Sequence, residues 1–474
     1  MNGPSWISRA PQAPYFMNED GESWTPVGHN DAITWPSLSG VLHRRDLASV
    51  DAYLGSLTSY GVTCIRLMLE YAESKEGHFE SPAGHFLPEM VQVWDDIFDL
   101  CRRHGLRILL TPFDTFWTWL KWSEHPYSIE NGGFLASPSR VLLCEETRNC
   151  IKARLEFASR RWGGSGTLFA WDLWNEIHPA QAEESAEGFS SFISDVSAHM
   201  RKLENELYGR HHLQTVSLFG PELVWRPDLD LATPTFRHPD LDFATIHIYR
   251  EGTIDDPQDT VAPALDMAAI VADSLRQIKD DRPFLDTEHG PIHSFKDHHV
   301  TLPAKFDDEY FRHMQWAHLA AGGAGGGMRW PNRIPHVLTP GMHEAQRAMA
   351  EFLPLIDWVN FRRRNCTDEV RLSTDRARAV ACADNKQAVL WLVRTDALTK
   401  EGLMRRRAKP LAVSVTVPGL APGFYQIIFW DTRAGAILAT RTLALRSGEM
   451  QIPFDLATDV AIAIQCKVAD PAEH

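Results

Sequence analysis

Eight short apolar runs alternate with longer amphipathic or polar segments between residues 24 and 335 of this 474-residue chain. Most of the runs are continuously hydrophobic, which is typical of parallel strands covered on both faces. Eight strand-then-helix units over roughly 300 residues predict an α/β fold built as a (β/α)8 barrel, the TIM barrel. The predicted strands are 24–30, 62–70, 107–114, 168–176, 215–222, 243–249, 283–288 and 324–330, and the clearest predicted helices are 89–104, 145–161, 186–207 and 264–279.

The pattern changes near residues 358–364, beyond which strand-like runs recur at close spacing between turn signals such as Pro418-Gly419. This rhythm predicts a small antiparallel β-sandwich. We therefore predict two domains, a catalytic barrel over residues 1–358 and a β-sandwich over residues 359–474. The sandwich lacks an obvious row of aromatic residues, so we expect it to support the barrel rather than to bind carbohydrate. Its predicted strands are 370–373, 378–383, 388–393, 411–417, 423–430, 436–445 and 460–465.

The charge balance disfavours two classes of partner. Lys and Arg number 47 against 62 Asp and Glu, which gives a net charge of −15. A field of this sign repels nucleic acid and anionic membranes, and no run of about 18 apolar residues is long enough to cross a bilayer. A neutral carbohydrate substrate suits this balance better. The 16 tryptophans are consistent with that expectation, because indoles stack on sugar rings, although most tryptophans in any protein simply pack.

Seven scattered cysteines, none in a Cys-x-x-Cys pair, predict neither a disulfide framework nor a zinc site. The first residues lack the basic and apolar regions of a signal peptide, so a cytoplasmic location is the default expectation. Secretion is the alternative if the natural start is missing. Nothing in the sequence indicates an oligomeric state.

Two glutamates stand at the ends of strand-like runs. Glu176 closes the stretch Trp171-Asp172-Leu173-Trp174-Asn175-Glu176, and Glu288 lies in Pro283-Phe284-Leu285-Asp286-Thr287-Glu288-His289-Gly290. In a TIM barrel the active site lies where strands end, and the fourth and seventh strands lie across the barrel mouth from each other. A facing pair of carboxyl groups is what double displacement at a sugar acetal requires.

Four separated motifs resemble those of a known group of enzymes. Trp174-Asn175-Glu176, His247-Ile248-Tyr249, Thr287-Glu288-His289-Gly290 and Trp330 are similar to the retaining glycoside hydrolases of clan A, and most of all to the cellulase-like glycoside hydrolase family 5. The resemblance covers about residues 15–345. It implies a retaining mechanism on a TIM barrel.

The resemblance also implies roles for individual side chains. Glu176 would be the general acid/base and Glu288 the nucleophile. In the remaining implied roles, Asn175 hydrogen-bonds the sugar 2-hydroxyl, Arg66 and Tyr249 contact the nucleophile, and His247 and Trp330 shape the subsite that holds the glycone. These assignments agree with the chemistry, since a guanidinium and a hydroxyl keep a nucleophile ionised. Retaining chemistry also predicts carboxyl groups about 5–5.5 Å apart.

The chain departs from the family pattern after the third predicted strand. Many family members carry a histidine there, and Asp114 and Trp117 are the candidates to replace it in substrate binding. The following loop, residues 116–138, also contains Trp119 and Trp122. Long loops with indoles often wall off a cleft, which favours a pocket and an exo-acting or short-oligosaccharide enzyme. An open groove for a polymer, as in an endo-acting β-glucanase or β-mannanase, is the alternative.

Other functions were weighed against this interpretation. A transglycosylase differs only in its acceptor, and a sugar-binding protein that has lost catalysis is disfavoured by the intact glutamate pair. The adjacent histidines at 211–212 and 298–299 do not have the spacing of a zinc site, and the glycine-rich stretch 322–327 lacks the ending of a phosphate-binding loop. We therefore predict no metal and no cofactor.

Overall fold

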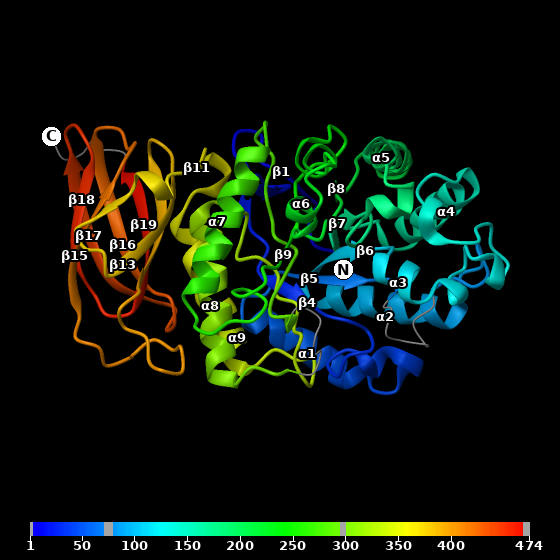
Figure 1. The fold of residues 1–474 in the computed structure, drawn as a ribbon, viewed down its shortest axis with the longest axis horizontal. Coiled ribbons are helices and arrows are strands. Elements are labelled where there is room, and N and C mark those ends of the chain that lie inside the picture. The colour runs from blue at the N-terminus through cyan, green and yellow to red at the C-terminus, as the bar shows by residue number, and fades with distance from the viewer. Residues whose placement is uncertain (1–2, 71–78, 294–299, 468–474) are drawn as a thin grey trace.

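The computed structural model describes residues 3–70, 79–293 and 300–467. Figure 1 shows two units side by side, a larger one of helices and strands and a smaller one made of strands. A three-stranded antiparallel sheet lies at the N-terminus of the larger unit, made of β1 (Ile7–Arg9), β2 (Phe16–Asn18) and β3 (Ser23–Trp24).

Parallel strands form the centre of the larger unit. Five pair in chain order: β4 (Gly28–Asn30), β5 (Cys64–Met68), β6 (Arg107–Thr111), β7 (Leu168–Asp172) and β8 (Leu213–Thr215). Two more, β9 (His247–Ile248) and β10 (Glu288–His289), pair with each other. Isolated parallel bridges join Phe219 to His247, His289 to Arg329, and Arg329 to His29. Single bridges thus connect the β9–β10 pair to the segment around Arg329, and that segment to β4.

Several predicted strands differ from the observed ones. The runs 243–249 and 283–288 are shortened to His247–Ile248 and Glu288–His289, and three other runs change near a proline or glycine. The run 24–30 is divided between β3 and β4 with Pro26 between them. Of the run 215–222 only Thr215 lies in a strand, and Pro221, which has no N–H to donate, directly precedes the helix that starts at Glu222. In the run 324–330 the described backbone makes only single bridges, and Gly325 and Gly327 have φ of 114° and 74°.

The predicted helices 89–104, 145–161, 186–207 and 264–279 are confirmed to within two residues at each end. The α-helices are α1 (Leu47–Ser59), α2 (Pro88–His104), α3 (Thr115–Leu120), α4 (Glu145–Trp162), α5 (Ala186–Tyr208), α6 (Glu222–Trp225), α7 (Ala262–Gln277), α8 (Ala304–Ala321) and α9 (Pro340–Phe352). Short 3-10 turns lie at Ser39–Arg44 (η1), Trp122–Glu124, Ile129–Asn131, Pro138–Arg140, Pro179–Ala182, Leu353–Leu355, Trp358–Asn360 and Thr367–Glu369, and a π-helix, η6, at Thr233–Arg237. In the described ranges, none of these helices combines the length and apolar character needed to span a membrane.

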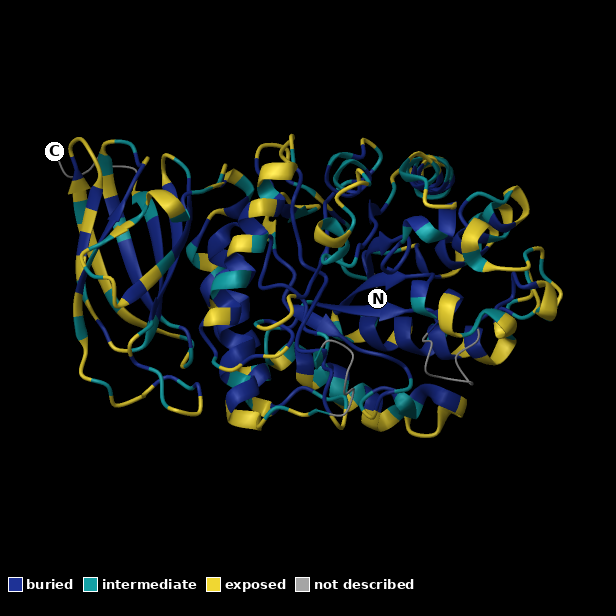
Figure 2. Cartoon of the chain, viewed as in Figure 1, coloured by how far each residue is buried: buried dark blue, intermediate teal, exposed yellow. Residues whose placement is uncertain are grey.

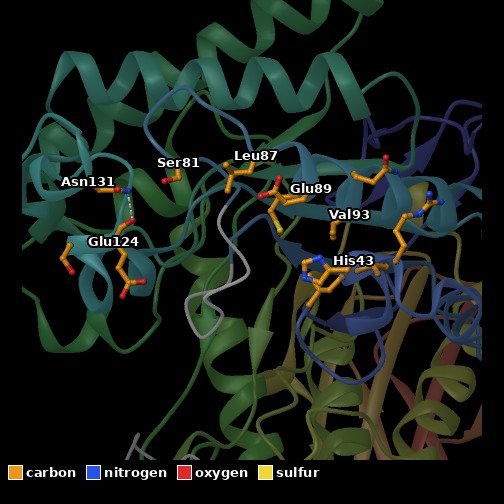
Figure 3. A pocket seen from close by; sticks show the side chains of 13 residues that line it. His43, Ser81, Leu87, Glu89, Val93, Glu124 and Asn131 are labelled. Atoms are coloured by element: carbon orange, nitrogen blue, oxygen red, sulfur yellow. Dashed lines mark hydrogen bonds between the residues drawn. The ribbon is translucent and has the colours of Figure 1, made fainter.

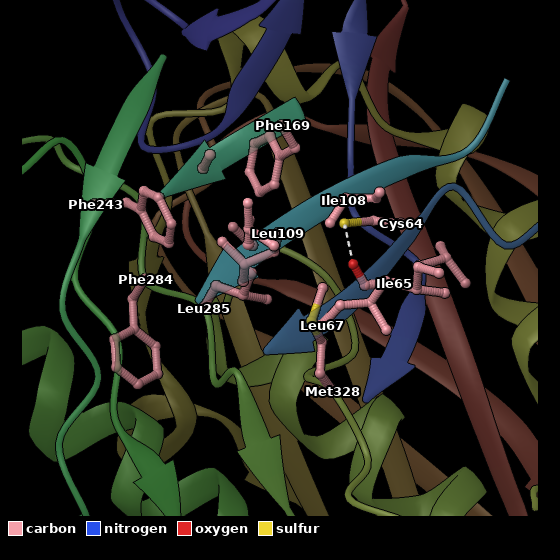
Figure 4. Close-up of a cluster of buried hydrophobic side chains, with 14 of the residues drawn as sticks. Cys64, Ile65, Leu67, Ile108, Leu109, Phe169, Phe243, Phe284, Leu285 and Met328 are labelled. Atoms are coloured by element: carbon pink, nitrogen blue, oxygen red, sulfur yellow. Dashed lines mark hydrogen bonds between the residues drawn. The ribbon is translucent and has the colours of Figure 1, made fainter. Parts of the chain in front are cut away.

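The strands of the larger unit direct apolar side chains into a common core. Figure 4 shows Leu67 on β5, Leu109 on β6 and Phe169 on β7 in one cluster with Phe243 and Phe284, and all five are buried. Burial of such side chains is the main stabilising contribution to folding. Helices cover the outside of this cluster, and the buried residues in Figure 2 follow the strands and the inner helix faces.

The smaller unit has two antiparallel sheets with a separate core between them. One has the order β11 (Arg364–Asn365), β13 (Ala377–Ala383), β14 (Gln387–Arg394), β19 (Asp459–Lys467), β16 (Gly423–Asp431) and β17 (Ala436–Leu445), and the other β12 (Arg371–Leu372), β15 (Leu411–Val417) and β18 (Met450–Leu456). The sequence did not predict strand β18, because this segment contains Pro453. The structure tolerates this proline because β18 is an edge strand that pairs only with β15. The domain boundary after residue 358 stays a prediction.

The central strands of the six-stranded sheet are buried on both faces, whereas the edge strand β17 is mostly exposed. The second face of the sheet packs against the larger unit, where Trp391 and Trp430 join the core of that unit. A buried ion pair crosses the contact: Arg312 of α8 donates from Nη1 to Asp459 Oδ2 over 2.6 Å. The Nε1–H of Trp391 donates to the same oxygen over 3.3 Å, and so does the hydroxyl of Thr432 over 2.5 Å. These contacts support the predicted role of the smaller unit as a support for the larger one.

Replacing Asp459 should destabilise both units together. The Asp459→Ala change removes the nearest carboxylate of the buried Arg312 guanidinium and leaves only the 3.8 Å contact with Glu309 Oε2, so it should cost up to about 3–5 kcal/mol. The urea midpoint should therefore fall markedly, whereas it should hardly move in the control Asp455→Ala, whose side chain is exposed. Equal midpoints for the two variants would contradict a supporting role for this ion pair.

Candidate active site

The two glutamates predicted as catalytic lie close together in space, although they come from the non-adjacent strands β7 and β10. Glu288 begins β10 and is in register with His247 of β9, and Glu176 follows β7 by four residues. Both are buried, with exposed fractions of 4% for Glu176 and 7% for Glu288. One ligand atom of each of Glu176, His247 and Glu288 lies within 4.8 Å of the other two. The structure therefore brings together the two carboxyl groups that the sequence predicted to face one another.

His247 lies between the two carboxyl groups. Its Nδ1 is 2.7 Å from Glu176 Oε1 and 3.6 Å from Glu288 Oε2. Burial, with the Arg66 charge nearby, holds the pKa of His247 well below its usual value, so the ring is neutral. A neutral imidazole places one nitrogen against Glu176 without adding a positive charge.

Arg66 of β5 connects most of the site. Its Nη1 donates to Glu288 Oε2 over 3.1 Å and to Asn30 Oδ1 over 2.9 Å. Its Nη2 donates to Asn175 Oδ1 over 2.6 Å and to Asp172 Oδ2 over 2.8 Å. The side chain is fully buried, so these contacts take place in a region of low dielectric constant, where charge interactions are strong. The prediction that Arg66 lies beside the nucleophile agrees with this geometry.

Asp172 was not predicted, and it joins the two halves of the site. Besides Arg66, it accepts the backbone N–H of Ser217 at Oδ1 over 2.8 Å and the Ser217 hydroxyl at Oδ2 over 2.9 Å. The Ser217 Oγ in turn accepts the backbone N–H of Glu176 over 3.1 Å. One carboxyl group therefore positions both the cation next to Glu288 and the backbone of Glu176. The signal in the sequence was a single charge within an otherwise apolar buried strand.

The backbone of Glu176 adopts a conformation that few side chains favour. Its φ is 47°, in the left-handed region, where a non-glycine residue costs of order 1–3 kcal/mol. Ser217 holds this turn from both sides, because its Oγ accepts the N–H of Glu176 and its carbonyl accepts the N–H of Ile177 over 3.0 Å. The strained turn directs the carboxyl group of Glu176 toward His247.

Glu288 is held by two further partners. The hydroxyl of Tyr249 donates to Glu288 Oε1 over 2.6 Å, as the sequence predicted. The backbone N–H of Glu288 donates to Asp286 Oδ1 over 3.1 Å, and Asp286 Oδ2 lies 2.6 Å from His289 Nδ1. Asp286 was also not singled out from the sequence. It is completely buried and fixes the turn that presents the nucleophile candidate.

Asp114 and Asn175 form a pair next to Arg66. Asn175 Nδ2 donates to Asp114 Oδ1 over 2.8 Å, and Asp114 also accepts the backbone N–H groups of Phe116 and Trp117 at the start of α3. These bonds orient the Asn175 amide, with its oxygen toward Arg66. Trp117 is buried, with an exposed fraction of 1%. Substrate contacts by Asp114 and Trp117 stay predictions.

Trp330 lies at the edge of the site and is only partly buried. It packs edge-on against Trp35, with ring centroids 4.9 Å apart and an interplanar angle of 72°. Its backbone N–H donates to the carbonyl of His289, next to Glu288, over 2.8 Å. This position suits the predicted role of Trp330 in a sugar subsite, which stays a prediction.

The environment separates the proton affinities of the two carboxyl groups. Burial and the negative charges of Glu288 and Asp114 hold the pKa of Glu176 well above its usual value. Burial also raises the pKa of Glu288, to about 7, but Arg66 and the Tyr249 hydroxyl act in the opposite direction. A single proton on the pair therefore resides on Glu176, which leaves Glu288 as the anion.

Glu176, His247 and Glu288 have ligand atoms close enough together to hold a cation. A guanidinium already occupies the Glu288 Oε2 position, because Arg66 Nη1 is 3.1 Å away. A divalent ion beside this charge would be repelled, and Arg66 also donates to Asn175 and Asp172 around it. The donor set therefore fits organic acid/base chemistry better than metal binding, and the absence of a metal stays a prediction.

A separate hollow of about 660 Å³ lies at the rim of the larger unit (Figure 3). Its walls include His43 of η1, Leu87, Glu89 and Val93 around the start of α2, and Glu124 after α3. Neither catalytic candidate is among the described residues that line it. The hollow is therefore distinct from the paired carboxyl groups.

Comparison with known proteins identifies relatives by structure only. No protein-family model matches the chain. No curated protein matches its sequence either. A glycoside hydrolase family 5 structure from Bacteroides vulgatus ATCC 8482 superposes with a TM-score of 0.60 at 12% identity, over 97% of this chain and 93% of that one.

Two further solved structures match over the larger part of the chain. An endo-1,4-β-D-mannanase from Thermotoga petrophila RKU-1 gives a TM-score of 0.52 at 15% identity, over 69% of this chain and all (100%) of that one. An exo-β-1,4-mannosidase from Opitutaceae bacterium strain TAV5 gives a TM-score of 0.51 at 18% identity, over 71% of this chain and 62% of that one. At these identities the likeness shows a shared fold, and the resemblance to family 5 predicted from the motifs agrees with it.

The hydrogen bond from Tyr249 makes a testable contribution to the charge of Glu288. In Tyr249→Phe the anion loses a donor, so the Glu288 pKa should rise. Carboxyl 13C shifts of glutamate-labelled protein, followed across pH, would report the change. Tyr127→Phe is the matched control, since Tyr127 is buried in the same unit and contacts neither glutamate in the described hydrogen bonds. An unchanged Glu288 titration in Tyr249→Phe would refute the assigned contact.

Proposed function

We propose that this protein is a retaining β-glycoside hydrolase that acts by double displacement through a glycosyl-enzyme ester. The observation that carries the proposal is the short separation of Glu176 and Glu288, whose nearest ligand atoms lie within 4.8 Å. Retaining glycosidases hold their carboxyl groups about 5–5.5 Å apart, whereas inverting enzymes need about 6.5–9.5 Å to admit a water molecule. The separation supports the retaining stereochemistry.

We also propose that the parallel strands close into a (β/α)8 barrel. The parallel bridges through Arg329 back to His29 support closure, and so does the likeness to family 5 structures. Active sites of such barrels lie at the carboxyl ends of the strands. Glu176 and Glu288 both lie at this end, as the barrel interpretation requires.

In the first step Glu288 Oε attacks the anomeric carbon while Glu176 donates its proton to the glycosidic oxygen. The leaving group departs as an alcohol, and an ester joins the sugar to Glu288. Arg66 and Tyr249 hold the attacking carboxylate in place. Asn175, fixed by Asp114 and Arg66, is placed to hydrogen-bond the sugar 2-hydroxyl.

In the second step Glu176, now ionised, takes a proton from water, and the resulting hydroxide attacks the anomeric carbon. The ester to Glu288 breaks, and the sugar leaves with its original configuration. Formation of the ester neutralises the carboxylate of Glu288. The pKa of Glu176 then falls, because the neighbouring negative charge is gone. The same residue therefore serves as acid and then as base.

The substrate is proposed to be a β-linked glycoside or short oligosaccharide attacked from its end. The loop after β6, which carries the half-exposed Trp119, supports a walled pocket. Two structural relatives are described as mannosidase and mannanase, so a β-mannoside is the first sugar to test. Endo-action on a β-glucan or β-mannan, and transfer to an acceptor sugar instead of water, are the alternative functions.

Removing the nucleophile should abolish turnover in a way that azide can rescue. With aryl β-glycosides that differ only in the sugar, Glu288→Ala should lose at least about 10⁴-fold in kcat, because no ester forms. Azide should restore aryl release and give a glycosyl azide of inverted configuration. The control Asp286→Asn keeps the nucleophile, so azide should not change its product. A retained-configuration product in Glu288→Ala would refute the assignment.

Removing the acid/base should depend on the leaving group. In Glu176→Ala the first step on a dinitrophenyl glycoside should be nearly normal, because this leaving group needs no proton, whereas a methyl glycoside should lose about 10²–10⁴-fold. Pre-steady-state bursts with both substrates measure the first step. An equal loss on both substrates would contradict the acid/base role of Glu176.

A further inference from the structure

The outer face of β9 carries an apolar groove that the catalytic chemistry does not use. Its walls come from α6, β9, η6 and α7, and it encloses about 520 Å³. This volume lies within the range of small-molecule sites, about 300–1,000 Å³. The main apolar wall residues are Leu223, Val224, Trp225, Phe236, Ile248 and Ile270.

The groove exists because the wall of the larger unit is thin at this point. Between β8 and β9 the described chain forms only the four-residue α6 and the five-residue η6. The adjacent helices α5 and α7 have 23 and 16 residues. A short cover leaves part of the apolar outer surface of the strand open. Figure 1 shows α6 next to β9 in this region.

The entrance of the groove is unusually apolar for a surface. Val224 is 73% exposed and Trp225 is 61% exposed, both on α6. Three more large apolar side chains, Trp119, Leu120 and Phe134, are exposed on the segment after β6, outside the lining of the groove. Exposed apolar patches of this kind mark places where a ligand or partner binds. The polar groups at the groove are Arg250, Glu251, Asp273, Ser274 and Gln277.

The groove and the candidate active site share two residues, although neither glutamate is among the described residues that line the groove. His247 and Tyr249 help to line it, and these same residues contact Glu176 and Glu288. Phe219 links the two places, with its ring 5.5 Å from Tyr249 and 5.7 Å from Trp225. A path of aromatic rings therefore leads from the nucleophile to the entrance of the groove.

The groove also lies on the side from which a leaving group departs. Arg66 contacts Glu288 and also donates to Asn30 of β4, and the glycone is proposed to bind on this side. The predicted acid, Glu176, follows β7, and its backbone N–H donates to Ser217, which lies between β8 and the groove residue Gly220. Beyond it, His178 contacts the ring of Trp119 at 4.8 Å and lies 3.4 Å from Glu222, the first residue of α6. An aglycone protonated by Glu176 is thus directed toward α6.

We propose that this groove binds an extended alkyl chain on the aglycone, so that the preferred substrate class is a β-glycoside with a long apolar leaving group. This inference rests on the proposed glycosidase function. The chain passes over Phe219 and Trp225 and lies along Ile248 and Ile270, where its methylene groups leave water. A polar oligosaccharide would lose water against the apolar walls without hydrogen-bonding partners there, which costs free energy.

The test is a chain-length series on one sugar. Methyl, hexyl, octyl and decyl β-glycosides of the sugar that the protein accepts are compared by kcat/KM below their micelle concentrations. The ratio of decyl to methyl should be at least about tenfold in the native chain. It should fall close to one in Trp225→Ala, which removes the entrance, and in Ala232→Phe, which fills the groove. Ile437→Ala on β17, exposed and remote, should keep the native ratio.

A direct binding measurement tests the groove independently of the proposed glycosidase function. Decanol titrated into the native chain and into Ala232→Phe, with unfolding midpoints to verify folding, reports the groove without any sugar. Binding that the Phe side chain abolishes supports the groove even if no glycoside is cleaved. If kcat/KM does not change with chain length and decanol does not bind, the proposed alkyl-chain groove is overturned. Turnover of the methyl glycoside would then leave the proposed glycosidase function intact. A dimer that Trp225→Ala dissociates, with an unchanged ratio, would also overturn the proposed alkyl-chain groove.

Discussion

The site depends on one buried ion pair, between Arg66 and Asp172. A guanidinium without an opposite charge is very unfavourable in a fully buried position, so Asp172 is what allows Arg66 to lie under the paired glutamates. Burial lowers the pKa of Arg66, but Asp172 and Glu288 more than offset this. Through Ser217, Asp172 also holds the strained backbone of Glu176. Removing this pair would therefore disturb both carboxyl groups at once.

The arrangement around the pair divides the two glutamates into different chemical states. Glu288 receives donors from Arg66 and Tyr249, which favour its anion, whereas Glu176 faces a neutral His247 and nearby negative charge. Two carboxyl groups this close cannot both be ionised at low cost. Because the donors Arg66 and Tyr249 both contact Glu288, the negative charge lies on Glu288 and the proton on Glu176. No additional cation is needed beside Glu176.

The smaller unit contributes by covering the larger one. Its six-stranded sheet has a core on each face, and β14 is buried along its whole length. The sheet contacts α8, the helix that leads into the Arg329 segment joining β10 to β4. Packing on α8 therefore supports the segment around Arg329, which bridges His289 of β10 and His29 of β4. A rigid support of this kind keeps catalytic groups within the small tolerances that they require.

The sequence by itself determined the order of strands and helices, the four longest predicted helices, and the residue types at the strand ends, including Glu176 and Glu288. These features are local, since apolar periodicity and short motifs are visible within a few residues. Only the tertiary structure decided which side chains meet. Asp172 pairs with an arginine 106 residues away, and no local pattern indicates such a partner. Prolines and glycines shortened the predicted strands because they withhold hydrogen bonds or turn the backbone, and the groove beside β9 arose because the segment before it formed only short helices.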